Sequence, residues 1–591
     1  MWRSARVRKA FPAVALSLLL VASGCEGAGA PGGKAPSSAP RKGGTLRIAS
    51  SGDVDSIDPG RIYYTVSYML FRVMVRTLVS YPPLGGEADQ ELAPDIAADI
   101  GQVSDDGMTY TFRLRDGVRY QPEAAGGREV RSADFRYAIE RGFKPSVANG
   151  YASLYFRDVI VGDTEYAQGK ADHIAGIDVS DPKKIVFRLR RRSADFLFRL
   201  ALPLTAPVPE EHAAPLDSQT PSAYGRSFAS TGPYMLERSG GEVTGYEAGK
   251  RIVMVRNPNW AARTDAIRKA YPDRIEMTEG FQDASLATRQ VLNGRVDLLA
   301  PDLLVPPAEI RRILASPQHR ERLHFSPSNL IYYVALNTTI EPFKDPKVRQ
   351  AVNYVMDKNA MRLAFGGPRR GRIATHVLSP GLPGFAEAGG TRYDPYPSKD
   401  FAGDVERAAE LMRQAGHADG KYSGPPVLMV GANPAALQRV ADVVEDSLAK
   451  IGITVRRESY EPNVTITSFL SVPKAGVAVA PNPAWFWDYP DAVTVMRPLF
   501  DGRLISPTGN NNFSLLDDAG LNALMDRAAG ALGPERARLW SEADKRVMEL
   551  APVVPWLWET AANPVSARVI GFTYSLGLAS PDLATISVAS D

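Results

Sequence analysis

Cysteine is almost absent from this sequence of 591 residues: Cys25 is the only one. Intramolecular disulfide bonds are therefore impossible, and thiol catalysis and cysteine-based metal sites in a folded domain are excluded. The chain must be stabilised by apolar burial alone, which its length permits. Its hydrophobic content of 44% and charged content of 23% are typical of a globular protein with a large core. The length suggests roughly three or four domain-sized units.

Signals of catalysis and of nucleic-acid binding are also lacking. The six histidines are scattered, and the sequence has no His-Glu-x-x-His motif, no Gly-x-Ser-x-Gly motif and no Gly-Lys pair followed by Ser or Thr. Each histidine is better explained as a surface residue or a hydrogen-bonded core residue. The formal net charge is only +3, which does not favour a nucleic-acid partner. We expect no enzyme activity, no metal and no cofactor.

The amino terminus has the pattern of an export signal. Four positive residues, Arg3, Arg6, Arg8 and Lys9, precede an apolar run from about Ala10 to Val21. This run is too short to span a bilayer comfortably, and no later segment reads as a membrane span. We therefore expect residues 1–24 to be a signal peptide and the folded body to be extracytoplasmic.

The residues around Cys25 resemble a bacterial lipobox, in which the cysteine is lipidated and becomes the mature amino terminus. Small residues precede the cysteine in the segment Val21-Ala22-Ser23-Gly24-Cys25, although Ala22 stands where leucine is more common. The alternative is an ordinary signal peptide with an incidental cysteine. The following residues are rich in Gly, Pro, Ala and Ser, which predicts a flexible spacer over 25–43. A lipid on Cys25 would tether the protein to the outer face of the cell membrane.

The folded body has a mixed α/β pattern. Residues 45–49 read as a strand, residues 65–80 carry apolar residues at helical spacing, and residues 284–292 read as a helix. Further strands are expected at 184–190, 252–255, 274–277 and 331–336. Residues 109–120 alternate and contain Asp116-Gly117, which predicts a hairpin, and Ser132 is the expected cap of the next helix.

A strand, helix and strand unit is well marked between residues 426 and 460. The strand VLMVG is followed by a helix from about Pro434 to Lys450, by Gly452 as a stop and by the strand ITVRRESY. Such a unit predicts a parallel strand pair with a right-handed crossover.

Several segments, taken in order, resemble the dipeptide and oligopeptide-binding family of extracellular solute-binding proteins. The resemblance spans nearly the whole mature chain. The matching segments are GGTLRIA, SIDP at Ser56–Pro59, LAPDIAADIGQVSDDGMTYTFRLRDGVRY, SADFRYAIERG, STGPY at Ser230–Tyr234, RNPNW at Arg256–Trp260, NGRVD at Asn293–Asp297, NTTIEPFKDPKVRQAVNYVMDK and PAWFWDYPD at Pro483–Asp491.

This resemblance implies a two-lobed, hinged periplasmic-binding-protein-like fold of type II, in the large cluster that carries an extra small domain. It also implies an ABC importer partner, with permease and ATPase subunits, and a protein that acts as a monomer. The expected divisions are residues 44–80 for the first segment of lobe 1, 81–195 for the extra small domain, 196–329 for the second segment of lobe 1, 330–530 for lobe 2 and 531–591 for the last segment of lobe 1.

The segment Pro483–Asp491 is similar to the family's Trp-x-x-Asp-Tyr segment, which lies at the ligand cleft of peptide-binding members. The resemblance makes Asp488 the candidate partner of a ligand ammonium group, with Trp485, Phe486, Trp487 and Tyr489 as aromatic walls. Backbone groups of Ala484 and Phe486 would pair with an extended peptide. The alternative is that these aromatic residues fill the core while Asp488 pairs with a structural arginine.

Tyr63 and Tyr64 are further candidates, because the opposite lobe of the family approaches the ligand after the Ser-Ile-Asp-Pro segment. They could equally be packing residues at a helix entry. Some dipeptide binders place an arginine for the ligand carboxylate before the helix of the strand, helix and strand unit, and Leu428–Asn433 contains none. A free dipeptide is therefore a less secure ligand.

The sequence leaves three alternatives to a peptide binder. The same fold could bind a sugar, a metal chelate or an amine-bearing metabolite, since fold does not determine ligand. A secreted hydrolase would need a nucleophile with its base or a metal cluster, and the motif search finds neither. A structural or signalling lipoprotein that has lost its transport partner is the third alternative.

Overall fold

The computed structural model describes residues 39–86, 90–147 and 155–589. The expected signal peptide, the lipidation site Cys25 and residues 25–38 of the expected spacer lie outside the described residues. Residues 40–591 form one compact unit. Within the described residues, no helix combines the length and the apolar character that a membrane crossing requires.

Among the described residues, the strands form two large sheets, one smaller sheet and several two-stranded ribbons. The first sheet has the order β11-β12-β13-β1-β14, with β8 paired to β12. Its strands are β1 (Thr45–Ala49), β8 (Tyr234–Leu236), β11 (Tyr246–Glu247), β12 (Arg251–Arg256), β13 (Arg274–Thr278) and β14 (Leu298–Leu299). A four-stranded antiparallel sheet has the order β4-β5-β7-β6, with β4 (Gln102–Val103), β5 (Thr109–Arg113), β6 (Ile177–Asp181) and β7 (Lys184–Arg188).

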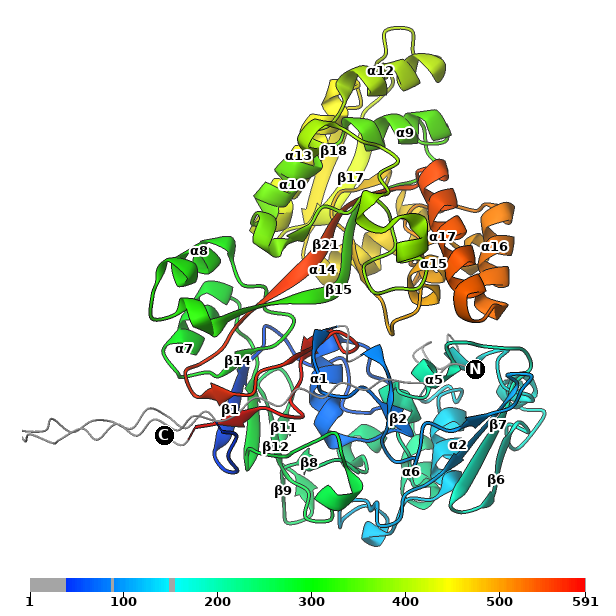
Figure 1. Ribbon diagram of the computed structural model, residues 1–591, viewed down its shortest axis with the longest axis vertical. Coiled ribbons are helices and arrows are strands. Elements are labelled where there is room, and N and C mark those ends of the chain that lie inside the picture. Colours follow the sequence, from blue (N-terminus) through cyan, green and yellow to red (C-terminus); the bar gives the residue numbers. More distant parts are fainter. Residues whose placement is uncertain (1–38, 87–89, 148–154, 590–591) are drawn as a thin grey trace, which may run out of the picture. The chain divides into compact units, whose positions relative to one another are not determined.

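The second large sheet has the order β16-β21-β15-β19-β17-β18, with β20 paired to β15. Its strands are β15 (Leu323–Leu336), β16 (Gly371–Arg372), β17 (Val427–Ala432), β18 (Val455–Tyr460), β19 (Val479–Ala480), β20 (Ala484–Phe486) and β21 (Val553–Pro564). Strands β15 and β21 run side by side and carry the chain between the two large sheets (Figure 1). We call the described residues of 44–322 and 565–589 the first lobe, and residues 323–564 the second lobe.

The ribbons and helices complete the two lobes. The ribbons pair β2 (Val79–Ser80) with β3 (Ala93–Pro94), β9 (Arg238–Ser239) with β10 (Glu242–Val243), β22 (Val569–Ile570) with β25 (Ser587–Val588), and β23 (Tyr574–Ser575) with β24 (Ser580–Pro581). The α-helices are α1 (Thr65–Met74), α2 (Ser132–Arg141), α4 (Asp163–Ala167), α5 (Phe196–Arg199), α6 (Glu210–Asp217), α7 (Ala284–Leu292), α8 (Pro307–Ala315), α9 (Pro346–Val355), α10 (Lys358–Phe365), α11 (Phe385–Ala388), α12 (Val405–Gln414), α13 (Ala435–Lys450), α14 (Pro462–Val464), α15 (Val493–Phe500), α16 (Ala519–Gly530) and α17 (Gly533–Leu550).

Several predicted elements are confirmed. Strand β1 and helix α7 have the predicted bounds, and the Asp283 carboxylate caps α7 by accepting hydrogen bonds from two backbone N–H groups of its first turn. Strands β17 and β18 are parallel and α13 connects them, as the sequence pattern predicts. The apolar periodicity of these segments is strong enough to set both their type and their limits.

Three local predictions are wrong. The helix expected over 65–80 ends at Met74, because Val75 turns to extended backbone and residues 79–80 pair with β3. The hairpin expected over 109–120 does not form, since β5 pairs with β4 and β7 instead. Ser132 is the first residue of α2 rather than its cap, and its hydroxyl donates to the Asp181 carbonyl oxygen. In each case a contact with another segment of the chain replaced the predicted local structure.

The limit expected between the second lobe, at 330–530, and the last segment of the first lobe, at 531–591, falls between two helices that pack against each other. Helix α17 contacts α16 and α15, and β21 then lies in the second sheet (Figure 1). We therefore place the return to the first lobe after β21, because the apolar faces of α16 and α17 are buried together.

Many residues of the segments that carry the family resemblance have structural contacts. Asp58 forms a buried ion pair of 2.8 Å with Arg141, the last residue of α2. The Asp297 carboxylate accepts hydrogen bonds from the backbone N–H of Arg47 in β1 and from the Ser566 hydroxyl. These contacts join segments far apart in the sequence, so these motif residues hold the first lobe together.

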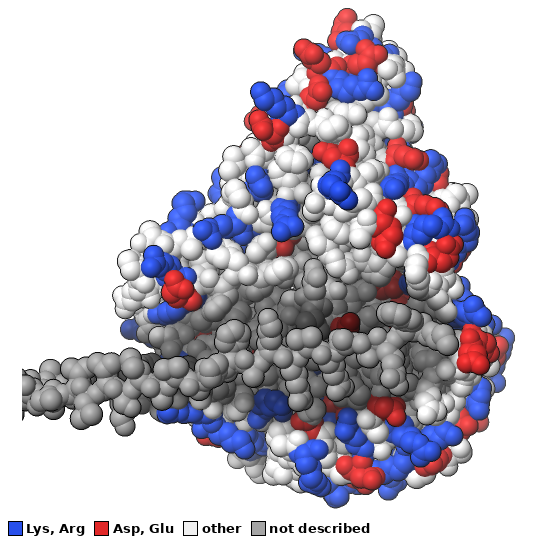
Figure 2. Space-filling model, viewed as in Figure 1, with Lys and Arg blue, Asp and Glu red and all other residues white. Residues whose placement is uncertain are grey.

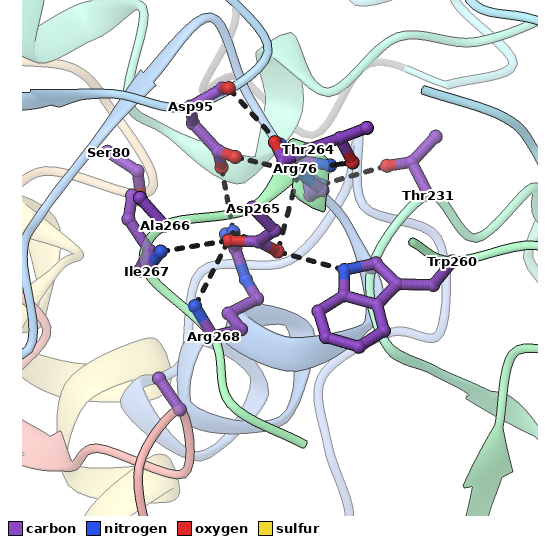
Figure 3. A network of polar contacts seen from close by, with 12 residues as sticks. Arg76, Ser80, Asp95, Thr231, Trp260, Thr264, Asp265, Ala266, Ile267 and Arg268 are labelled. Carbon is purple, nitrogen blue, oxygen red and sulfur yellow. Dashed lines mark hydrogen bonds and ion pairs between the residues drawn. The ribbon is translucent and has the colours of Figure 1, made fainter. Parts of the chain in front are cut away.

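A buried network of charged groups lies in the first lobe beside α1 (Figure 3). The Arg76 guanidinium pairs with Asp95 at 2.7 Å, and Arg268 pairs with Asp95 at 2.9 Å and with Asp265 at 3.3 Å. Burial alone would raise the pKa of Asp265, but Arg268 and Arg76 hold it well below its usual range. Two arginines therefore balance two aspartates out of contact with water.

We expect Arg268→Met to lower the free energy of unfolding by about 3–5 kcal/mol, because it leaves two buried carboxylates with a single arginine, Arg76. Urea unfolding followed by circular dichroism measures this change. The control is Arg251→Met, which removes an exposed arginine 3.6 Å from Glu247 and should cost less than about 1 kcal/mol. Equal effects of the two substitutions would contradict a structural role for the network.

Candidate functional site

The segment from Ala484 to Asp491 is fixed at both ends. Strand β20 pairs with β15 in antiparallel register, with Trp485 opposite Ile331. The Asn329 side-chain amide donates to the Trp487 carbonyl oxygen at 2.9 Å. At the other end, the Asp491 carboxylate forms a buried ion pair of 2.7 Å with Arg536 of α17. The residues between these anchors are therefore held in one position.

The four candidate aromatic residues separate into two pairs. Trp487 and Tyr489 are buried, with exposed fractions of 1% and 2%. Phe486 is 38% exposed, and Trp485 is partly buried with its indole N–H donating to the Thr494 carbonyl oxygen. Trp487 and Tyr489 thus pack in the interior, while Phe486 remains open to solvent on the same face of β20 as Ala484.

Tyr489 joins the two lobes. Its hydroxyl donates a hydrogen bond of 2.6 Å to the Asp195 carboxylate of the first lobe, and its ring stacks on Phe198 with centroids 5.9 Å apart. Asp195 also pairs with Arg199 at 2.7 Å. Burial alone would raise the pKa of Asp195, but Arg199 and Arg536 hold it below its usual range. The acceptor of the Tyr489 hydroxyl is therefore a charged carboxylate.

Asp488 lies beside this contact, and its Oδ2 atom is out of contact with solvent and has no hydrogen-bond partner. Burial raises the pKa of Asp488 to about 6, while the hydroxyls of Tyr63 and Tyr155 act in the opposite direction. No lysine or arginine of the described residues lies within ion-pair distance of it. The structural arginine that the alternative interpretation requires pairs with Asp491 instead.

Tyr63 and Tyr64 lie at the entry to α1 in the first lobe, where the Asp55 carboxylate accepts hydrogen bonds from both backbone N–H groups. The Tyr63 hydroxyl lowers the pKa of Asp488, which belongs to the second lobe. Tyr64 is 47% exposed, and burial together with Asp55 and Glu461 raises its pKa. Both tyrosines therefore face the second lobe.

A cavity of about 250 Å³ opens next to β20. First-lobe residues from Leu299 to Val305 line one side, and residues of β15, β20 and β21 line the other, including Ala484 and Phe486. No other strand pairs with β20 among the described residues. Its free edge and this cavity together provide backbone hydrogen-bonding groups beside an open space.

Metal-binding arrangements are not found in the part of the chain that the structure describes. No group of three or more His, Cys, Asp and Glu side chains is placed to hold a metal ion. The closest pair of this kind, His376 with Asp544 at 2.5 Å, is completely buried beside Phe385 and Trp558. His376 is thus a hydrogen-bonded core histidine.

Comparison with known proteins decides the family. Residues 91–506 match the model of the bacterial extracellular solute-binding proteins, family 5 Middle. The chain belongs to this family. Its members are non-enzymatic solute-binding proteins of ABC transporters and act outside the cytoplasm.

The relatives of this family 5 protein bind different solutes. The solved structure of clavulanic acid biosynthesis oligopeptide binding protein 2 superposes with a TM-score of 0.82 and 32% identity, covering 94% of this chain and 97% of the other. Heme-binding protein A of Haemophilus influenzae is 25% identical over 490 residues, 81% of each chain. Glutathione-binding protein GsiB of Salmonella paratyphi A is 25% identical over 534 residues, 89% of this chain and 91% of the relative.

The predicted fold class is confirmed by these comparisons: the chain has the two-lobed periplasmic-binding-protein-like fold with the extra domain. Basic and acidic side chains are intermingled on the face shown in Figure 2. Four residues near the site of this family 5 protein were not predicted from the sequence: Tyr155, Asp195, Arg370 and Glu559. No local motif marks these residues, because each reaches the site through a contact with a segment distant in the sequence.

We expect Asp488→Asn to stabilise the ligand-free protein by on the order of 1–3 kcal/mol at pH 7.5. The folded state raises the pKa of this acid to about 6, above the unfolded value, so ionising it costs stability as the pH rises from about 4 through 6. Below that range the wild type and the variant should unfold alike. Thermal unfolding at pH 4 and pH 7.5 measures the difference, and an equal shift at both values would contradict the burial of this charge.

Tyr489→Phe removes the hydroxyl that joins the lobes, and we expect the ligand-free protein to open. Loss of a hydrogen bond to a charged carboxylate shifts such an equilibrium by about 1.5–3 kcal/mol. Small-angle X-ray scattering should show a larger radius of gyration. The matched control is Tyr333→Phe, because the buried Tyr333 hydroxyl has no hydrogen-bond partner. An unchanged radius for Tyr489→Phe would contradict a joining role.

Proposed function

We propose that this ABC-transporter solute-binding protein captures peptides with a free amino terminus in the cleft between its lobes. The observation that carries the proposal is the Asp488 carboxylate, which has one oxygen shielded from solvent and no lysine or arginine of the described residues within ion-pair distance. A ligand ammonium group would supply the missing charge. At ~4 Å and a moderate effective dielectric the attraction is about 4 kcal/mol, before desolvation costs.

The surroundings of Asp488 support a peptide rather than a simple amine. Strand β20 ends two residues before it, and its free edge offers the backbone N–H and C=O groups that an extended peptide can pair with. Such pairing depends on groups that all peptides share. The 32% identical structure is that of an oligopeptide binding protein, which favours the same class of ligand.

Ligand capture would favour the closed arrangement of the lobes. Tyr489, Phe198 and Asp195 already connect the lobes next to Asp488, so a ligand bound to Asp488 and Tyr63 adds contacts to both sides of the same cleft. A ligand that contacts both lobes shifts the population toward closure. The closed protein would then present the ligand to the permease and ATPase subunits of the importer.

The tether completes the proposal. The lipobox-like segment ending at Cys25 would anchor a monomer to the outer face of the membrane, and the following Gly, Pro, Ala and Ser-rich spacer would let the lobes reach the permease. Cys25→Ser should release the protein from membranes into the soluble fraction.

The test compares tetra-alanine with its amino-terminally acetylated form by isothermal titration calorimetry. We expect acetylation of the peptide and Asp488→Asn each to weaken binding by at least about tenfold, because each removes one partner of a buried charge pair. The control is Asp446→Asn, an exposed acid on α13. Equal binding of the free and acetylated peptides would reject the role of Asp488.

A second experiment separates the peptide from the other solutes. A thermal-shift screen of sugars, metal chelates, glutathione, heme and amine metabolites identifies a ligand if tetra-alanine does not bind. Binding of an amine metabolite, lost in Asp488→Asn, would keep the ammonium site and reject the peptide. Turnover of a bound peptide would instead support the alternative that the protein is a hydrolase.

A further inference from the structure

The cavity beside β20 has mainly apolar walls. Leu303 and Leu304 of the first lobe face it from one side, and Leu330 of β15 and Phe486 of β20 line the other. Because Ala484 and Phe486 point to the same face of β20, a peptide paired with this strand would direct a side chain into the cavity. The walls can therefore bury the aliphatic part of that side chain.

A buried ion pair also lines this cavity. Arg370 Nη2 and Glu559 Oε1 are 2.8 Å apart, and the two side chains are only 3% and 5% exposed. Arg370 precedes β16, whose Gly371 lies opposite Glu559 in β21. A side chain at Gly371 would collide with the Trp558 carbonyl oxygen, so this glycine lets Arg370 approach Glu559. The pair is neutral as a whole.

Beside this pair, the polar residues that line the cavity are Asp302, Ser328, Tyr332, Asn563 and Tyr574. The Asn563 side-chain Nδ2 atom is buried without a hydrogen-bond partner, so one donor is available. Asp302 is exposed, and its Oδ2 atom already accepts hydrogen bonds from Ser50, Ser51 and Gly52. Solvent screens the charge of Asp302 far more than that of the buried pair. The buried part of the cavity therefore carries no net charge, and the Asn563 Nδ2 and Ser328 Oγ atoms in it have no hydrogen-bond partner.

We propose that this cavity receives one side chain of the bound ligand and selects an uncharged one, with Arg370, Glu559 and Asn563 as the residues that determine this specificity. The inference rests on the proposed function, because it requires a peptide in the cleft. An acidic or basic side chain would leave one net charge buried beside a pair that is already balanced. A side chain such as that of glutamine would bury its aliphatic part and accept a hydrogen bond from Asn563.

Charge-changing variants test the selection. The probes are tri-alanine peptides in which Leu, Gln, Glu or Lys replaces alanine at each position in turn, measured by isothermal titration calorimetry. In the wild type we expect the Leu and Gln peptides to bind at least about tenfold more tightly than the Glu and Lys peptides at one position. Asn563→Leu should weaken the Gln peptide relative to the Leu peptide at that position, because it removes the hydrogen-bond donor.

The two single substitutions of the pair should have opposite effects. Glu559→Gln leaves Arg370 unpaired, so the Glu peptide should gain at least about tenfold relative to the Leu peptide. Arg370→Gln leaves Glu559 unpaired, so the Lys peptide should gain instead. If either variant does not fold, the double variant Arg370→Met with Glu559→Met keeps the test possible, because it removes both charges together and should still reject Glu and Lys.

The controls and contrary outcomes are distinct. Glu535→Gln and Arg538→Gln change an exposed pair of 2.7 Å on α17 and should leave the order of the peptides unchanged. If the peptides bind but their order is the same in the wild type and all pair variants, the specificity pocket is wrong while the proposed function stands. If no peptide binds to the wild type, the proposed function fails and this inference fails with it.

Discussion

The site is built around one constraint: a carboxylate oxygen is shielded from water, and no lysine or arginine of the described residues pairs with it. Asp488 Oδ2 has this environment, and burial raises the pKa of the acid accordingly. An acid in this position is costly unless a partner is supplied from outside the chain. The anchors on both sides of it, the β20 pairing and the ion pair of Asp491 with Arg536, prevent it from turning away.

Other buried aspartates of the chain show how unusual this arrangement is. Asp58, Asp95, Asp195, Asp265 and Asp491 each lie within ion-pair distance of at least one arginine. These pairs hold segments together and need nothing from solution. Asp488 and Asp491 are three residues apart, yet only the second has an arginine. The same residue type therefore serves structure at one position and ligand capture, as we propose, at the other.

The contact of Tyr489 with Asp195 links the Asp488 site to the arrangement of the two lobes. This hydrogen bond lies next to Asp488 and runs from the second lobe to the first. The proposed ligand site and the contact between the lobes are therefore adjacent. The cavity beside β20 extends the same region with a second kind of selectivity, since its Arg370 and Glu559 pair is neutral whereas Asp488 is not. One end of a ligand would thus be recognised by its positive charge, and one of its side chains would be selected because it is uncharged.

The sequence by itself determined the class of the protein and the elements with strong local periodicity. The order of motifs identified the family, and the apolar spacing defined α7 and the β17, α13 and β18 unit, because these features depend on neighbouring residues. It also singled out Asp488, Tyr63 and Phe486. Predictions failed where another segment replaced the predicted local structure, as for the hairpin expected at 109–120, where β5 pairs with β4 and β7, and for the helix expected to continue to residue 80, where residues 79–80 pair with β3.

Only the tertiary structure decided which candidates share a site. Trp487 and Phe486 are adjacent in sequence, but one is buried and the other faces solvent, because alternate positions of an extended segment point to opposite faces. Tyr155, Asp195, Arg370 and Glu559 come from four separate segments, and folding alone brings them to the cleft. Burial, and pairing between separate segments as for Arg370 with Glu559 and Asp491 with Arg536, set the surroundings of these acids, and no local pattern carries that information.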